Sequence, residues 1–146
     1  MKKLKKAFTL LEMLVVIGII AILVALSASS YSTAQRKARD AKRKSDLKTI
    51  QNAFEQYYSI CNFNYPNSVP NGASKLTATV ANCSSLSADV DLITMPSDPL
   101  GGNYQCGATC DPTGYTICPR DIVSGKYLET EDCNSTNKSC CVTNQQ

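Results

Sequence analysis

The N-terminal segment constrains the fold of this chain more than any other stretch. Four lysines within residues 2–6 precede an apolar run over residues 8–28, whose only charged side chain is Glu12. A helix of about 20 residues crosses the hydrocarbon core of a bilayer, so the run is long enough to span a membrane. The leading lysines predict a cytoplasmic N-terminus, with the remainder of the chain exported.

Glu12 is the unusual residue of this run. A charged side chain at the centre of a membrane helix costs about 2.5–3.5 kcal/mol, and such groups are functional by default. Glu12 lies near one end of the run, however, where its carboxylate can reach the headgroup region without any specific role. Its position alone leaves both interpretations open.

Residues 7–12, Ala-Phe-Thr-Leu-Leu-Glu, resemble the processing site of type IV prepilins and pseudopilins. Members of that family have a short basic leader, a cleavage point just before a Phe, and a Glu as the fifth residue of the mature chain. The resemblance implies that a prepilin peptidase cuts between Ala7 and Phe8 and methylates the Phe8 amine. It also implies that Glu12 pairs with the N-terminal amine of a neighbouring subunit. The family usually has Gly before the cut, whereas this chain has Ala7.

An ordinary secretory signal peptide is the alternative for this segment. Such a signal has an apolar core of about 7–15 residues followed by a small-x-small cleavage site. Ala25-Leu26-Ser27 can supply that site. The run in this chain is longer, and a signal peptide has no use for Glu12. We therefore expect a membrane helix that stays attached to the mature protein.

The chain is expected to continue as a helix beyond the apolar run. No Pro or Gly interrupts residues 19–65. Residues 33–58 contain an apolar stripe at helical spacing, formed by Leu47, Ile50, Phe54 and Tyr57 or Tyr58. A stripe of small residues precedes it, formed by Ala34, Ala38 and Ala41. A helix with this pattern packs one face against a small domain.

These observations predict four segments. Residues 1–7 are a leader peptide, and 8–30 are a transmembrane helix that forms the core of a filament. Residues 31–58 are an amphipathic helix packed on a head, and 59–146 are a globular, cysteine-rich head. The expected fold class is α+β, with a long N-terminal α-helix on a small, disulfide-stapled antiparallel sheet, as in the type IV pilin fold that the resemblance implies.

Basic residues are concentrated in residues 35–48. Helical spacing predicts three ion pairs there: Asp40 with Arg36, Asp40 with Lys44, and Asp46 with Lys42. The stretch is either a surface for DNA or anionic lipid or, as we favour, a charged collar on a solvated helix. After residue 58 the chain has four basic and eight acidic residues, which argues against a nucleic-acid-binding head.

The head is expected to start with a variable loop over residues 59–97. Residues 96–99, Pro-Ser-Asp-Pro, resemble the element that precedes the first strand in pilins and pseudopilins. The expected elements are a short helix within 75–81 or 84–92, two strands at 104–106 and 115–120 around a turn at 111–114, and a third strand through 126–128.

All eight cysteines lie after residue 60, in the part expected to be exported. They are Cys61, Cys83, Cys106, Cys110, Cys118, Cys133, Cys140 and Cys141. An even number in this compartment predicts a disulfide framework, although eight cysteines allow 105 pairings. The pairs that we expect are Cys61–Cys83, Cys106–Cys118, and Cys133 with Cys140 or Cys141. A zinc site is the alternative, because the Cys106-x-x-x-Cys110 spacing resembles half of one.

No cofactor is expected. Calcium is the one alternative, because Asp89, Asp91 and Asp98 lie where the major pseudopilin of type II secretion has a calcium site. A solvated loop is the favoured interpretation, since Ca²⁺ needs six to eight oxygen ligands. The chain has no histidine, which removes the commonest general base and His metal ligands. No catalytic constellation is present in the sequence, so we do not expect an enzyme.

The resemblance implies a structural subunit of a type IV pilus-like filament, polymerised through its N-terminal helix, that supports adhesion, twitching motility or DNA uptake. The expected partners are identical or homologous pilin subunits, a prepilin peptidase, an inner-membrane assembly platform and a host or environmental surface, with DNA left open. The precursor is expected in the cytoplasmic membrane and the product in a cell-surface pilus. The alternatives are a pseudopilin of a secretion or competence system, an anchored surface protein that never polymerises, and a secreted enzyme.

Overall fold

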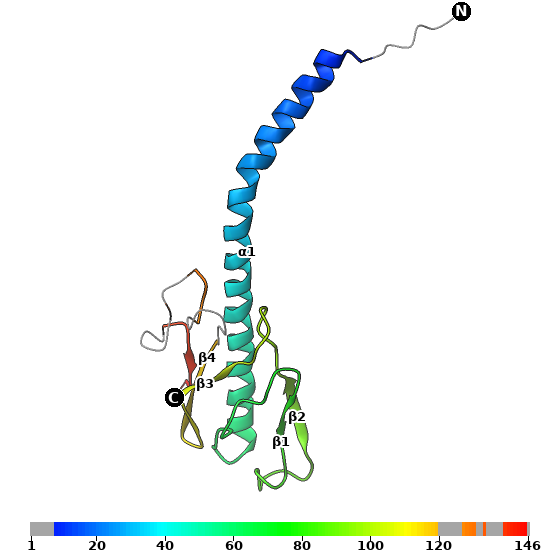
Figure 1. Ribbon diagram of the computed structural model, residues 1–146. Helices are drawn as coiled ribbons and strands as arrows, with labels where there is room; N and C mark the ends of the chain where they lie inside the picture. Colours follow the sequence, from blue (N-terminus) through cyan, green and yellow to red (C-terminus); the bar gives the residue numbers. More distant parts are fainter. Residues whose placement is uncertain (1–7, 120–126, 131–132, 134–138, 146) are drawn as a thin grey trace, which may run out of the picture. The chain divides into compact units, whose positions relative to one another are not determined.

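The computed structural model describes residues 8–119, 127–130, 133 and 139–145. Its elements are α1 (Leu10–Ile60), β1 (Lys75–Ala78), β2 (Val90–Thr94), β3 (Gln105–Asp111), β4 (Gly114–Cys118) and β5 (Val142–Thr143) (Figure 1). The chain divides into two compact units, Met1–Arg36 and Lys37–Gln146, and α1 contributes to both. This long helix, with small antiparallel sheets and several disulfides, confirms the α+β fold class.

The N-terminal unit is an apolar helix without a core of its own. Thr9 caps α1, because its hydroxyl oxygen accepts a hydrogen bond from the Glu12 N–H at 3.2 Å and its carbonyl accepts one from the Met13 N–H at 3.3 Å. The large apolar side chains from Phe8 to Leu26 are exposed. By length and composition, this helix is able to cross a membrane.

The unit from Lys37 onward consists of the C-terminal part of α1 and the head, and its core lies on the expected stripe of α1. Leu47, Ile50, Phe54 and Tyr57 are all buried, whereas Tyr58 is only partly buried. The Phe54 ring packs on Tyr115 of β4, with 5.0 Å between ring centroids. The small-residue stripe is different, because Ala34, Ala38 and Ala41 are exposed.

The expected short helix in the variable loop is wrong. Residues 75–78 form β1 instead, and β1 pairs antiparallel with β2 through a bulge after Leu76. Leu76 and Ala78 are buried and the residues between and before them are not, which is the period-two alternation of a strand. Over 84–92, a turn bonded from the Leu86 N–H to the Cys83 carbonyl leads into β2.

The expected hairpin is present, and its first strand is longer than expected. β3 and β4 pair antiparallel around Pro112 and Thr113. The Asp111 carboxylate accepts hydrogen bonds from the Thr113 N–H at 2.8 Å and the Gly114 N–H at 3.1 Å, which closes the turn. The second strand ends at Cys118 rather than at residue 120, which lies outside the described residues.

The third strand of this sheet is β5, not residues 126–128. β5 pairs antiparallel with β4, with Thr116 opposite Thr143 and Ile117 opposite Val142. Tyr127 and Leu128 are not in a strand, and residue 126 lies outside the described residues. Figure 1 shows this three-stranded sheet and the β1–β2 sheet beside the C-terminal part of α1.

Four disulfides join all eight cysteines: Cys61–Cys83, Cys106–Cys110, Cys118–Cys141 and Cys133–Cys140. The expected Cys106–Cys118 pair is wrong. Instead, Cys106 is bonded to Cys110, and this disulfide spans the part of β3 where the register with β4 shifts. Cys118 at the end of β4 bonds to Cys141, which directly precedes β5. The second bond fastens the C-terminal strand to the sheet.

Candidate functional site

A buried arginine fixes the head to α1. Arg43 lies one helical turn before Leu47, on the same face of α1, and its exposed fraction is 0%. Its guanidinium grips the Asp98 carboxylate through two bonds, Nε to Oδ2 at 2.6 Å and a terminal nitrogen to Oδ1 at 2.9 Å. This two-pronged geometry is the strongest arrangement of an arginine and a carboxylate.

Asp98 is presented by a tight turn between β2 and β3. The Gly101 N–H donates to the Asp98 carbonyl at 2.9 Å, and the Asp98 N–H donates to the Gly102 carbonyl at 3.1 Å. Gly101 has a φ of 80°, a backbone conformation that glycine adopts at little cost. The Asp98 carboxylate also accepts from the Leu100 N–H at 2.9 Å. The Pro-Ser-Asp-Pro element thus places the buried Asp98 carboxylate against Arg43 of α1.

Asp40 and Glu129 complete the group that we call the Arg43 cluster, with Arg39, Arg43 and Asp98. Arg43 donates to Asp40 at 3.0 Å and to Glu129 at 3.4 Å, and Arg39 grips Glu129 through bonds of 2.6 and 2.5 Å. Asp40 also accepts from the backbone N–H groups of Glu129 at 3.0 Å and Thr130 at 2.8 Å. The cluster ties three segments of the chain together: α1, the turn at Asp98 and residues 129–130.

A second acid on the same helix anchors the sheet side of the head. Asp46 accepts hydrogen bonds from the Lys42 ammonium at 2.6 Å and from the buried Tyr104 hydroxyl at 2.9 Å. Burial, and then the bond to Asp46, raise the pKa of the Tyr104 hydroxyl. The expected Asp46–Lys42 pair is therefore present. Asp40, for which spacing predicted surface pairs with Arg36 and Lys44, forms a buried ion pair with Arg43.

The Arg43 cluster predicts acid sensitivity. The hydrogen bond from Arg39 holds the pKa of Glu129 below its usual value of 4.5. Burial alone raises the pKa of Asp40, but bonds from Thr130 and Glu129 outweigh it and leave the pKa below its usual value of 3.8. Carboxylates with lowered pKa values stabilise the fold above their unfolded-state values and lose that effect as the pH falls through the folded values.

Thermal unfolding should therefore shift to lower temperature as the pH falls from about 4.5 toward 2. Glu129→Gln should flatten this acid limb, because the amide does not titrate there. The measurement is the circular dichroism melting temperature at stepped pH values, with the exposed Glu12→Gln variant as control. An acid limb that is equally steep in Glu129→Gln and in the parent would contradict this assignment.

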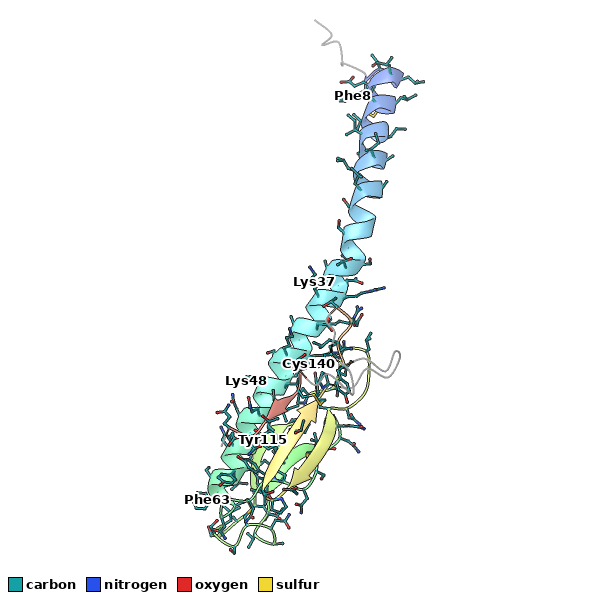
Figure 2. The ribbon with its side chains drawn as sticks, turned by 90° about the vertical axis from the view of Figure 1, so that its left-hand side faces the viewer. Phe8, Lys37, Lys48, Phe63, Tyr115 and Cys140 are labelled. Carbon is teal, nitrogen blue, oxygen red and sulfur yellow. A yellow bond between two sulfur atoms is a disulfide. The ribbon has the colours of Figure 1, made fainter. Side chains whose placement is uncertain are left out.

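The N-terminal residues form a separate candidate site. Phe8 is 71% exposed and stands directly before the cap residue Thr9. Figure 2 shows the Phe8 side chain at the start of the helix. Glu12 is the one acidic residue in the first turn of α1 and is exposed. Ala7 lies outside the described residues.

Comparisons with known proteins bear directly on this segment. Residues 2–28 match the family model described as the prokaryotic N-terminal methylation motif. This motif is the class III signal peptide of type IV pilins, and residues 2–28 are similar to it. No curated protein and no solved structure matches the chain. The motif and the apolar helix fit a membrane-anchored precursor of the type IV pilin and pseudopilin kind.

The matched motif includes the residues that start α1. The motif covers the basic leader, Phe8, Thr9, Glu12 and the apolar run in one stretch. Thr9 and Glu12 have the spacing of a capping box, in which a Thr three residues before a Glu starts a helix. The structure has half of that box, the bond from the Glu12 N–H to the Thr9 hydroxyl.

The three acids considered for a calcium site each bond to different protein groups. Asp98 is held by Arg43, whereas Asp91 on β2 accepts from Lys75 at 2.5 Å and from Thr77 at 2.7 Å. The Asp89 carboxylate accepts from the Val80 N–H at 2.8 Å. Among the described residues, the carboxylate oxygens of these three acids do not lie close enough together to form a metal site. The one group of potential metal ligands found there consists of cysteines.

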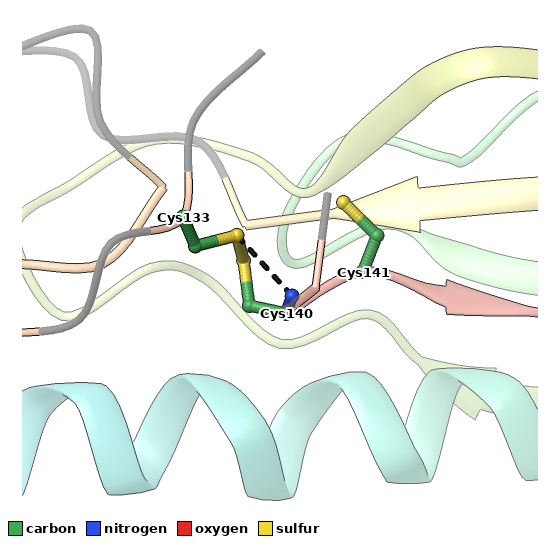
Figure 3. A group of neighbouring side chains, drawn as sticks. All are labelled: Cys133, Cys140 and Cys141. Atoms are coloured by element: carbon green, nitrogen blue, oxygen red, sulfur yellow. Dashed lines mark hydrogen bonds between the residues drawn. A yellow bond between two sulfur atoms is a disulfide. The ribbon is translucent and has the colours of Figure 1, made fainter. Parts of the chain in front are cut away.

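That cluster consists of Cys133, Cys140 and Cys141, whose sulfur atoms lie within 4.8 Å of one another (Figure 3). Cys133 is bonded to Cys140, and Cys141 is bonded to Cys118. The Cys140 N–H donates to the Cys133 sulfur at 3.2 Å. Zinc takes thiolate ligands, so these sulfurs cannot serve it while they are oxidised. The Cys106-x-x-x-Cys110 spacing is likewise a disulfide.

Sequence reasoning missed the Arg43 cluster. The basic stretch looked like a solvated collar, yet Arg43 and Asp40 are buried. The available signal was the spacing of Arg43 from Leu47, Ile50 and Phe54, which places it on the apolar stripe. A charge on a buried face requires a partner, and the Asp98 turn supplies one.

Proposed function

We propose that the chain is the structural subunit of a type IV pilus-like filament. In this proposal a prepilin peptidase cuts between Ala7 and Phe8 and methylates the new amine, and the apolar half of α1 then packs against the same segment of other subunits. The supporting observation is an apolar helix with its large side chains exposed, in a segment that matches the N-terminal methylation motif. An assembled bundle of such helices removes that surface from both lipid and water.

Glu12 has the physical properties for a role in assembly. The mature amine of Phe8 would lie at the start of α1, where the helix dipole is positive and a further positive charge is unfavourable. The unperturbed pKa of an α-amino group is about 8, so this amine is protonated at neutral pH. A carboxylate from a neighbouring subunit neutralises it. In the same step the Glu12 charge gains a partner inside an apolar bundle.

The head would then face outward on the filament. Its four disulfides suit an exported domain that works outside the reducing cytoplasm. Display of the head would support adhesion, twitching motility or DNA uptake, and an inner-membrane assembly platform would load the subunits. The precursor would lie in the cytoplasmic membrane with its N-terminus inside.

Glu12→Gln tests the proposal. The variant should be cleaved normally, because the cut lies before Phe8, but it should be depleted at least about a hundredfold from sheared filaments. That estimate follows from the loss of about 3–5 kcal/mol when one partner of a buried ion pair is removed. The measurement is quantitative immunoblotting of sheared and membrane fractions from the native host.

Met13→Leu is the matched control, since it changes a neighbouring apolar residue of the same helix without altering charge. It should enter filaments as the parent does. Normal incorporation of Glu12→Gln would contradict a role for this carboxylate in assembly. Processed chain that remains wholly in the membrane in the parent would contradict the filament itself.

A further inference from the structure

The head contains a cleft at the C-terminal end of α1, with a volume of about 530 Å³. Its walls come from the last turns of α1, the loop of residues 64–70, strand β1 and the loop of residues 81–82. This volume falls within the range of about 300–1,000 Å³ that is usual for small-molecule sites. The N-terminal unit contributes nothing to it.

Tyr57 is the residue that marks the cleft as a binding site. It is a core residue with an exposed fraction of only 6%, and it lines the cleft. No side-chain nitrogen or oxygen that is fully buried among the described residues lacks a hydrogen-bond partner. Among the described residues no hydrogen bond involves the Tyr57 hydroxyl, so this oxygen must keep some access to solvent.

The other buried tyrosines show that this is unusual for the head. The Tyr65 hydroxyl donates to Glu55 at 3.0 Å, and the Tyr115 hydroxyl donates to the other oxygen of the same carboxylate at 2.8 Å. The Tyr104 hydroxyl donates to Asp46 at 2.9 Å. Each of these hydroxyls is paired within the protein. The Tyr57 ring is buried, and its hydroxyl is able to form a hydrogen bond with a ligand.

The remaining polar groups of the cleft, apart from Lys75, are neutral. Asn67, Ser68 and Asn82 are exposed along it, and none of their side chains donates to or accepts from another described residue. Lys75 is the one charged residue of the lining, and its ammonium is paired with the Asp91 carboxylate at 2.5 Å. The cleft thus offers mainly amide and hydroxyl groups, which both donate and accept, and its single charge already has a carboxylate partner.

The walls of the cleft are fixed before any ligand arrives. The Cys61–Cys83 disulfide joins the end of α1 to the segment that carries Asn82. The Tyr65 N–H donates to the Pro112 carbonyl at 3.1 Å, and the Tyr58 ring stacks on Tyr65 with 4.4 Å between centroids. Preorganised polar groups reduce the ordering cost of binding.

We infer that this cleft binds a neutral carbohydrate. Sugar hydroxyls donate and accept hydrogen bonds alternately around a ring, which is what a set of amides and hydroxyls without charge can satisfy. The half-buried Pro70 in the lining gives a rigid apolar edge that suits the C–H face of a sugar. An acidic glycan would have to compete with Asp91 for Lys75, the one charged residue of the lining. The inference concerns the head alone and holds whether or not the chain forms filaments.

The test uses the full chain in lipid nanodiscs, which avoids detergents with sugar headgroups. A printed array of neutral and sialylated oligosaccharides is screened first, and the best neutral probe is then titrated with saturation-transfer NMR as the readout. Tyr57→Phe and Asn67→Ala should each weaken binding about three- to tenfold, the usual effect of one neutral hydrogen bond. Tyr31→Phe and Asn52→Ala, which lie outside the cleft, should leave the affinity unchanged.

Folding is controlled separately. Tyr57→Phe removes a hydroxyl without an internal partner and should keep the melting temperature of the parent. The inference would be overturned if no neutral oligosaccharide bound, if only sialylated probes bound, or if the cleft variants bound as tightly as the controls. Because monomeric chain in nanodiscs is used, a negative result here says nothing against assembly, and a failure of assembly would not affect this result.

Discussion

Replacing Arg43 by methionine is expected to lower the free energy of unfolding of the head by about 3–5 kcal/mol. The substitution keeps much of the side-chain volume but leaves Asp98 and Asp40 buried without their cation. An unpaired buried charge costs far more than a lost surface ion pair, which is worth about 0–1 kcal/mol. Chemical denaturation of the full chain in micelles, followed by circular dichroism, measures the change.

Two further variants make the Arg43 result specific. Lys37→Ala removes an exposed cation from the same helix and should change the free energy by no more than about 0.5 kcal/mol. The double variant Arg43→Met with Asp98→Asn should recover part of the loss, because the stranded carboxylate is then neutral. A loss of less than about 1 kcal/mol in Arg43→Met would contradict the buried cluster.

Removing the Cys61–Cys83 disulfide by a double serine substitution is expected to cost about 3 kcal/mol of stability. The bond closes a stretch with a sequence separation of 22 residues, which contains β1 but not its partner β2. Without it, the unfolded chain gains the freedom of that loop. The free energy of unfolding of the double variant, compared with that of the oxidised parent, gives the effect.

The Cys106–Cys110 disulfide is the matched control for loop length. Its sequence separation is 4, so its double serine variant should cost less, about 2 kcal/mol on the same chain-entropy argument. The difference between the two pairs is the quantity of interest, since both variants remove two sulfurs. Equal or reversed costs would contradict the view that Cys61–Cys83 acts mainly by limiting the unfolded chain.

Local patterns in the sequence predict the local parts of this fold well. The spacing of Leu47, Ile50 and Phe54 identifies the buried face of α1, and an Asp-Pro-Thr-Gly turn identifies the β3–β4 hairpin. The N-terminal motif is read directly, because leader, Phe8, Glu12 and apolar run lie in one continuous stretch. In each case the information is contained within a few helical turns or one hairpin.

Long-range partners are what the sequence does not specify. Arg43 and Asp98 are 55 residues apart, and neither local sequence indicates that the other residue is its partner. β1 and β2 are short and interrupted by a bulge, so their alternation is weak in the sequence and is decided by mutual pairing. The two-residue β5 is held by its pairing with β4 and by Cys118–Cys141. Disulfide connectivity likewise depends on which strands become neighbours.

We propose that this chain is processed before Phe8 and assembled through its N-terminal helix. Mass spectrometry of the N-terminal peptide, from membrane and sheared surface fractions of the native host, tests it most directly. We expect a chain that begins at methylated Phe8 and is present in the sheared fraction. A chain that begins at Met1, or one that begins near Ala28 after ordinary signal cleavage, would contradict the claim.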